Sequence, residues 1–232
     1  MMKPLLWLAV GLAAIVAGWL LIAPDPADDA WRIDATAPRI VGDATDPFAY
    51  AGGDALRTVS GSATIRLAEG GGEGTVRLSI EADETGPPLS LRDGAIVGRS
   101  WTLVLPIDEA ATVWIDTSIH GDTGIGDRRL PETTARLAGA GRFELTIDQD
   151  RRVTGQRGFW SVADAVRQED GSIRQQGLLF SPLLRDKARF SDPSRLELTV
   201  VLYEDGSDSD VLVHLVFANP AVERAPAAPT DD

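Results

Sequence analysis

The chain has 232 residues, of which 44% are apolar, so it is long enough for one sizeable domain with a core of its own. Its formal net charge is −13 at pH 7, which excludes nucleic acid as an expected partner, because binding to phosphates depends on clustered positive charge. There is no cysteine, which excludes disulfides, thiolate metal sites and cysteine nucleophiles.

The N-terminal region contains an unbroken apolar run at 5–23. As a helix this run would be about 28 Å long, which matches the hydrocarbon core of a bilayer. Lys3 precedes the run and Asp25 and Asp28 follow it, so the positive-inside rule places the N-terminus in the cytoplasm. We therefore predict that residues 1–23 form a single-pass anchor in the cell membrane, with the rest of the chain outside the cytoplasm. A cleaved signal peptide is the alternative.

The exported part divides by composition into three segments. Residues 24–55 are rich in Pro, Asp, Ala and Gly and predict a spacer. Large apolar side chains within it, such as Trp31 and Phe48, indicate that part of the spacer packs on the domain. We expect the domain itself at 56–218 and a disordered tail at 219–232.

Alternation of apolar and polar residues dominates the predicted domain. It predicts a hairpin and further strands, which lie at 63–67, 76–80, 101–105, 113–119, 143–147, 196–202 and 211–217. A period of two places each apolar set on one face of a sheet, and two such faces have to meet to become buried. The sequence thus predicts an all-β fold, an antiparallel β-sandwich, with a barrel-like fold as the second choice.

Only one segment of the domain favours a helix. Residues 161–168 begin with Ser161, a good capping residue, and carry Asp164 three positions later. The domain is therefore expected to contain at most one short helix.

The loop at 120–129 is the first candidate binding segment. It is rich in glycine and carries His120, Asp122, Asp127 and Arg128. Long loops often hold binding residues. One histidine and two aspartates within one loop are nevertheless more typical of a solvated turn than of a metal site, so we expect no metal and no cofactor.

A second candidate segment follows at 157–160. Arg157 and Trp160 are residue types that anchor contacts between proteins, and Phe159 lies between them. The alternative is that the two aromatic residues are a core plug beneath the short helix.

Motifs for catalysis are weak. Asp122-Thr123-Gly124 matches the tripeptide of aspartic proteases, but that chemistry requires two facing carboxylates from separate lobes. Asp116 lies in the same short segment and cannot supply the second lobe. His214 alternates with apolar residues and is interpreted as a core or edge histidine. The acidic turn at 204–210 is interpreted as solvated, and calcium binding there is left open.

These observations favour a protein without enzymatic activity. We predict a membrane-tethered extracytoplasmic accessory, scaffold or binding module of the cell envelope, with another envelope protein as partner. One alternative is a barrel-like carrier of a small apolar ligand. The other is a hydrolase that uses the carboxylates of Asp116, Asp122 and Asp127.

Overall fold

The computed structural model describes residues 30–42, 46–53, 56–58, 60–67, 74–81, 100–107, 112–147, 151–183, 190–203 and 211–225. The predicted anchor at 1–23 and the acidic turn at 204–210 lie outside the described residues. Within the ranges just given, no helix has the length and apolar character needed to cross a membrane.

The prediction of an all-β antiparallel fold is confirmed, since regular structure in the described residues is almost entirely strand. The strands are β1 (Ala30–Thr36), β2 (Arg39–Val41), β3 (Leu56–Thr58), β4 (Ser60–Leu67), β5 (Gly74–Glu81), β6 (Ser100–Ile107), β7 (Thr112–Ile119), β8 (Thr133–Ile147), β9 (Arg151–Ala165), β10 (Arg174–Gln175), β11 (Leu178–Leu179), β12 (Asp192–Tyr203), β13 (Val211–Ala218) and β14 (Ala221–Ala225). The predicted hairpins correspond to the pairs β4–β5 and β12–β13.

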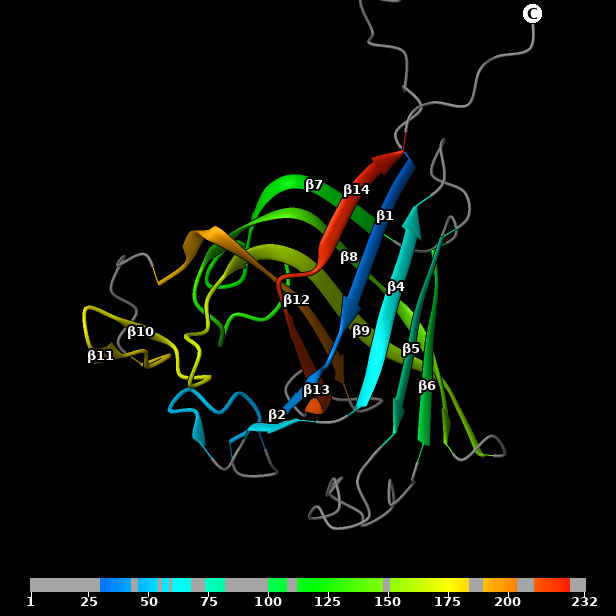
Figure 1. Cartoon of the computed structure of the whole chain (residues 1–232), viewed down its shortest axis with the longest axis horizontal. Coiled ribbons are helices and arrows are strands. Elements are labelled where there is room, and N and C mark those ends of the chain that lie inside the picture. Colours follow the sequence, from blue (N-terminus) through cyan, green and yellow to red (C-terminus); the bar gives the residue numbers. More distant parts are fainter. Residues whose placement is uncertain are drawn as a thin grey trace, which may run out of the picture.

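Twelve of these strands form one sheet, and β10 and β11 form a separate hairpin. The order in the large sheet is β14-β1-β4-β5-β6-β8-β9-β12-β13-β2-β3, and β7 adds to β8 beside this path. Every strand pair is antiparallel. The sheet curls into a half-barrel, with β1, β4, β5 and β6 forming one wall (Figure 1).

Two sharp bends link the ends of this curled sheet. Only Ala37 and Pro38 separate β1 from β2, although these strands lie near opposite ends of the strand order. Asn219 and Pro220 separate β13 from β14 in the same way. Ala37 and Asn219 both have positive φ values, 54° and 52°, a conformation that breaks an extended strand. The bends therefore force the two ends of the sheet toward each other.

The sequence predicted two separate sheets, whereas the described strands form a single curved one. The difference comes from β8 and β9, each 15 residues long, and β12, which has 12 residues. Their ladders contain register shifts, for example between Phe143 and Leu145, and such bulges let a long strand bend and continue around a curve. Alternation in the sequence reports the buried face of a strand but not whether the strand belongs to one sheet or two.

The short helix predicted at 161–168 is wrong. Residues up to Ala165 continue β9, with Val162 paired to Leu137 of β8 on one side and to Leu198 of β12 on the other. Hydrogen bonds from two neighbouring strands outweigh a weak local preference for helix.

The interior of the half-barrel is a packed apolar core. Trp160 is fully buried there, and a Cβ added at Gly139 would lie only 2.4 Å from its indole nitrogen. Glycine at 139 is thus required by the close approach of the ring. Other members of this core include Ile33, Ile65, Leu137, Phe143, Leu145, Val162, Leu198, Val200, Leu202, Leu215 and Phe217.

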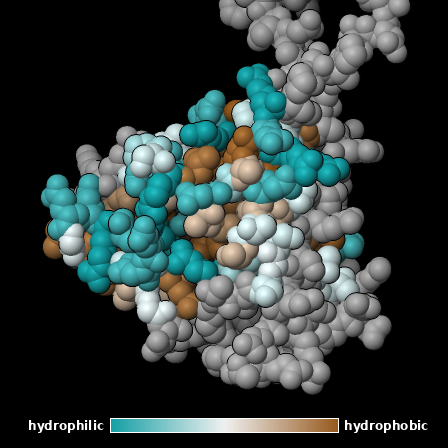
Figure 2. Space-filling view, in the orientation of Figure 1, coloured by the Kyte–Doolittle hydropathy of each residue, from teal (hydrophilic) through white to brown (hydrophobic). Residues whose placement is uncertain are grey.

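The outer face of β8, β9 and β12 is covered as well. Phe159, Val201 and Tyr203 form a second cluster with Ile119 on this side. The loop after β7 and the segment 46–53 lie over part of this face, so the central strands are buried on both faces only beneath them. Hydrophilic residues cover much of the surface formed by the described residues, with apolar side chains visible between them (Figure 2).

The sheet extends beyond the predicted domain limits at both ends. β1 and β2 come from the predicted spacer, and β14 comes from the predicted tail. β14 pairs with β1 from Ala30 to Asp34, which adds a strand to the edge of the sheet.

Candidate functional site

The glycine-rich loop after β7 is organised around His120. Its side chain is 3% exposed, and its Nδ1 accepts a hydrogen bond of 3.0 Å from the Asp127 backbone N–H. The backbone N–H of His120 donates to the Ile125 carbonyl oxygen at 2.6 Å. A Cβ at Gly126, whose φ is +77°, would lie 2.6 Å from His120 Nδ1, so only glycine allows this approach. The loop is a folded structure rather than the solvated turn that the sequence indicated.

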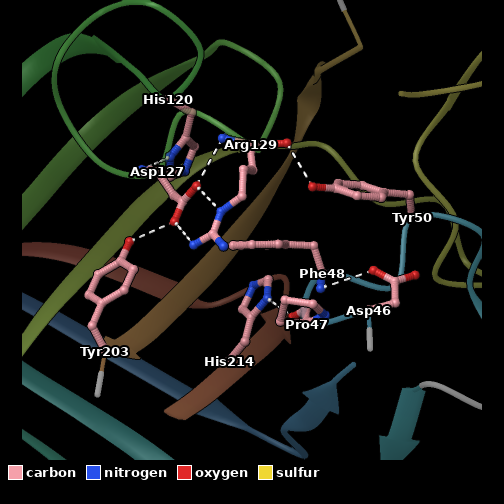
Figure 3. A network of polar contacts seen from close by, with 9 residues as sticks. All are labelled: Asp46, Pro47, Phe48, Tyr50, His120, Asp127, Arg129, Tyr203 and His214. Carbon is pink, nitrogen blue, oxygen red and sulfur yellow. Dashed lines mark hydrogen bonds and ion pairs between the residues drawn. The ribbon is translucent and has the colours of Figure 1, made fainter. Parts of the chain in front are cut away.

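Asp127 is the electrostatic centre of the loop (Figure 3). Its Oδ1 accepts hydrogen bonds from the backbone N–H and the Nε–H of Arg129, at 2.8 and 2.9 Å. Its Oδ2 accepts from Arg129 Nη2 at 2.7 Å and from the Tyr203 hydroxyl at 3.0 Å. Burial alone raises the pKa of Asp127, but hydrogen bonds from Arg129 and Tyr203 outweigh burial and hold the pKa below its ordinary value. The carboxylate stays ionised and its acceptor positions are occupied, which suits a structural role.

Arg129 connects this loop to the segment 46–53. Its guanidinium lies 4.5 Å above the Phe48 ring, and its carbonyl oxygen accepts a hydrogen bond of 3.0 Å from the Tyr50 hydroxyl. Asp46 holds the segment in shape by accepting from the backbone N–H of Ala49 at 2.8 Å. The two segments therefore form one cover over the outer face of the sheet.

A buried polar chamber lies between this cover and the sheet. We use this name for the enclosed space lined by His120, Arg167, Glu197 and His214, whose volume of about 10 Å³ leaves room for about one water molecule. The four side chains are 2–6% exposed. The expectation that His214 is a buried core or edge histidine is confirmed: its Nδ1–H donates to the Pro47 carbonyl oxygen at 3.2 Å.

Neither chamber histidine is suited to acid–base chemistry near neutral pH. Burial lowers the pKa of His120 to about 4. Burial and the nearby charge of Arg167 lower the pKa of His214 to about 3. Both imidazoles are neutral at pH 7, and the Nδ1 of each is engaged by backbone.

Arg167 carries a buried charge that is stabilised by backbone carbonyls. Its Nη1 donates to the carbonyl oxygens of Ala49 at 3.1 Å and Gly171 at 2.8 Å, and its Nη2 donates to that of Phe48. Burial raises the pKa of Glu197, while the charge of Arg167 acts in the opposite direction. Arg167 thus fastens the segment 46–53 to the turn after β9.

An open groove lies between the loop after β7 and the outer face of the sheet. Its volume is about 650 Å³. We call it the Arg–aromatic groove, and the residues that define it are Trp114, Ile125, Arg128, Arg157, Phe159 and Tyr203. Trp114 comes from β7, Phe159 from β9 and Tyr203 from β12, so three strands position its floor. The Trp114 and Phe159 rings lie 6.3 Å apart, and Arg157 lies 5.1 Å from the Tyr203 ring centre.

Only some of the site residues that the sequence predicted lie together in the structure. Asp127, Arg128 and Arg157 are brought together in the lining of the groove. His120 lies beneath the loop, and Asp122 is exposed on it without lining the groove. The expectation that Trp160 contacts a partner needs correction. Alternation along β9 turns its side chain into the core and leaves it 0% exposed, where it cannot meet a partner.

The carboxylates considered for hydrolysis are not arranged as a catalytic pair. Asp116 and Asp122 are exposed, so they lack the enclosure that two carboxyls need to share a proton. Asp127 is engaged by Arg129 and Tyr203. Among the residues that the structure describes, no three His, Asp or Glu side chains are grouped so that they could hold a metal ion.

The chain was compared with family models, curated proteins and solved structures. No family model, curated protein or solved structure matches the chain. The groove and the loop beside it are therefore the features from which we infer a function.

Sequence reasoning missed several residues of the site. Tyr203 continues the outward-facing series of Thr199 and Val201 on β12, so alternation could have placed it on the outer face. Arg167 offered no such signal, because nothing in the sequence distinguishes an arginine that binds carbonyl oxygens from one that is solvated. Trp114 lies in the predicted strand 113–119, but the sequence did not mark it as part of a site.

Proposed function

We propose that the chain is a membrane-tethered extracytoplasmic binding module of the cell envelope, without enzymatic activity, which contacts an envelope protein through the Arg–aromatic groove. The observation that carries this proposal is the convergence of Arg128 and Arg157 on the aromatic floor formed by Trp114, Phe159 and Tyr203. Arginine, tryptophan and tyrosine are the residue types that dominate binding energy at protein interfaces. The volume of the groove lies within the range of binding sites.

Two further observations weigh against the alternatives. The ionisable groups of the buried polar chamber and of Asp127 are enclosed or saturated, which disfavours a hydrolase. The half-barrel interior holds large side chains such as Trp160 and Phe143, both fully buried, which disfavours a carrier that stores its ligand there.

Co-purification of the tagged full-length chain from detergent-solubilised membranes tests the proposal. We expect a stoichiometric partner to remain bound to the unaltered chain. Combining Arg128→Glu with Arg157→Glu should reduce partner recovery at least about tenfold, equivalent to roughly 1.4 kcal/mol of binding free energy.

The matched control combines Arg66→Glu with Arg136→Glu, since both arginines are exposed and neither lines the groove. It makes the same change in net charge and should retain the partner. Equal recovery by both double variants, or a chain that purifies alone, would show that the groove is not the interface.

A further inference from the structure

The Arg–aromatic groove is positively charged within an acidic protein. Its lining contains Arg128, Arg129 and Arg157 against Asp127, so three positive charges and one negative give a net charge of +2. The whole chain carries −13. Asp127 is engaged by Arg129 through two side-chain hydrogen bonds, which removes its carboxylate as a competitor for an incoming ligand. The local charge thus favours an anionic occupant.

The floor of the groove adds an apolar surface next to these charges. Trp114 and Ile125 are partly exposed, while Phe159 and Tyr203 are buried beneath and beside them. A flat or bulky apolar group placed on Trp114 would share the groove with the guanidinium groups of Arg128 and Arg157. The site therefore matches a ligand that combines carboxylates with a large apolar side chain.

The shape of the groove distinguishes between sources of negative charge. It is an open groove of about 650 Å³ between the loop after β7 and the central strands, and it is lined by residues from five separate segments. A peptide segment can enter such a groove, whereas a bilayer surface is flat and cannot fill it. The geometry favours a peptide segment over lipid headgroups.

We infer that the Arg–aromatic groove binds an acidic peptide segment of the partner, with carboxylates on Arg128 and Arg157 and an aromatic side chain against Trp114. This inference rests on the proposed function, because it names the chemistry of the partner at the same site.

The experiment uses the full-length chain in phosphatidylcholine nanodiscs and three labelled pentapeptides, followed by fluorescence anisotropy. Their sequences are Glu-Asp-Phe-Asp-Glu, its amide counterpart Gln-Asn-Phe-Asn-Gln, and Glu-Asp-Ala-Asp-Glu. We expect the first to bind at least about tenfold more tightly than either of the others, and its affinity to fall as salt rises. The variant with Arg128→Glu and Arg157→Glu should lose binding, and the variant with Arg66→Glu and Arg136→Glu should retain it.

Equal affinity for the acidic and amide peptides, or binding that survives the groove variant, would overturn the inference. The second contrary result concerns lipid. The chain would be labelled with 5-fluorotryptophan and transferred to phosphatidylglycerol nanodiscs. A shift of the Trp114 fluorine signal there, with no peptide binding, would also overturn the inference. If no peptide binds while partner recovery still depends on Arg128 and Arg157, the acidic-peptide class is wrong and the binding module stands. If no peptide binds and partner recovery does not depend on Arg128 and Arg157, both the acidic-peptide inference and the proposed binding module are wrong.

Discussion

Replacing Arg167 by leucine is expected to lower the free energy of unfolding by about 3–5 kcal/mol. The change leaves the carbonyl oxygens of Phe48, Ala49 and Gly171 without their buried donor. It also removes the positive charge that favours ionisation of Glu197, which is 6% exposed. Urea denaturation of the full-length chain in detergent, followed by tryptophan fluorescence, measures the effect.

Arg136→Leu provides the control for this measurement, because Arg136 is exposed on β8. Its unfolding free energy should stay within about 0.5 kcal/mol of the unaltered chain. Similar losses for the two substitutions would mean that Arg167 does not fasten the segment 46–53 to the turn after β9.

Acidification from pH 7 to pH 4 is expected to destabilise the fold by several kcal/mol. His120 and His214 titrate near pH 6.5 in the unfolded chain, but their pKa values in the folded chain are lowered to about 4 and about 3. Below pH 6.5 the unfolded chain therefore binds more protons than the folded chain, and stability falls as pH falls. One pKa unit corresponds to about 1.4 kcal/mol, so each histidine contributes on the order of 3 kcal/mol by pH 4.

Asparagine substitutions isolate this effect. Asparagine at 120 offers an acceptor in place of Nδ1, and asparagine at 214 offers a donor in place of Nδ1–H. Chains with His120→Asn and His214→Asn should lose most of their pH dependence between pH 6.5 and 4. Glu197 acts in the opposite sense, since its raised pKa makes the folded chain bind a proton first. An unchanged slope in the double variant would contradict the assignment to the buried polar chamber.

Local patterns predicted the strands better than their assembly. The turn between 67 and 76 and the one between 202 and 211 join strands that are adjacent in sequence, and both hairpins are confirmed. The closure of the sheet depends on bends at Ala37 and Asn219, and neither position holds glycine, the residue that marks a positive φ most clearly in a sequence. β14 was missed because only one of its five residues, Val222, has a large apolar side chain, so the strand does not stand out from a tail predicted to be disordered.

In the candidate site too, residues marked by a local sequence pattern were predicted, and residues that reach the site from distant segments were missed. Asp127 and Arg128 were found because a glycine-rich loop is visible in the sequence, and Arg157 because aromatic residues follow it. Tyr203 reaches Asp127 from 76 residues away, and Arg167 reaches Phe48 from 119 residues away. Such contacts depend on the order of strands in the sheet, which alternation does not encode.

Photo-cross-linking from the groove in intact membranes tests the central claim most directly. With p-benzoylphenylalanine in place of Ile125, the full-length chain should give one distinct adduct that disappears when Arg128→Glu and Arg157→Glu are added. The same group in place of Ser60, which is exposed on β4, should not give that adduct. No adduct from position 125, or the same adducts from both positions, would contradict recognition through the Arg–aromatic groove.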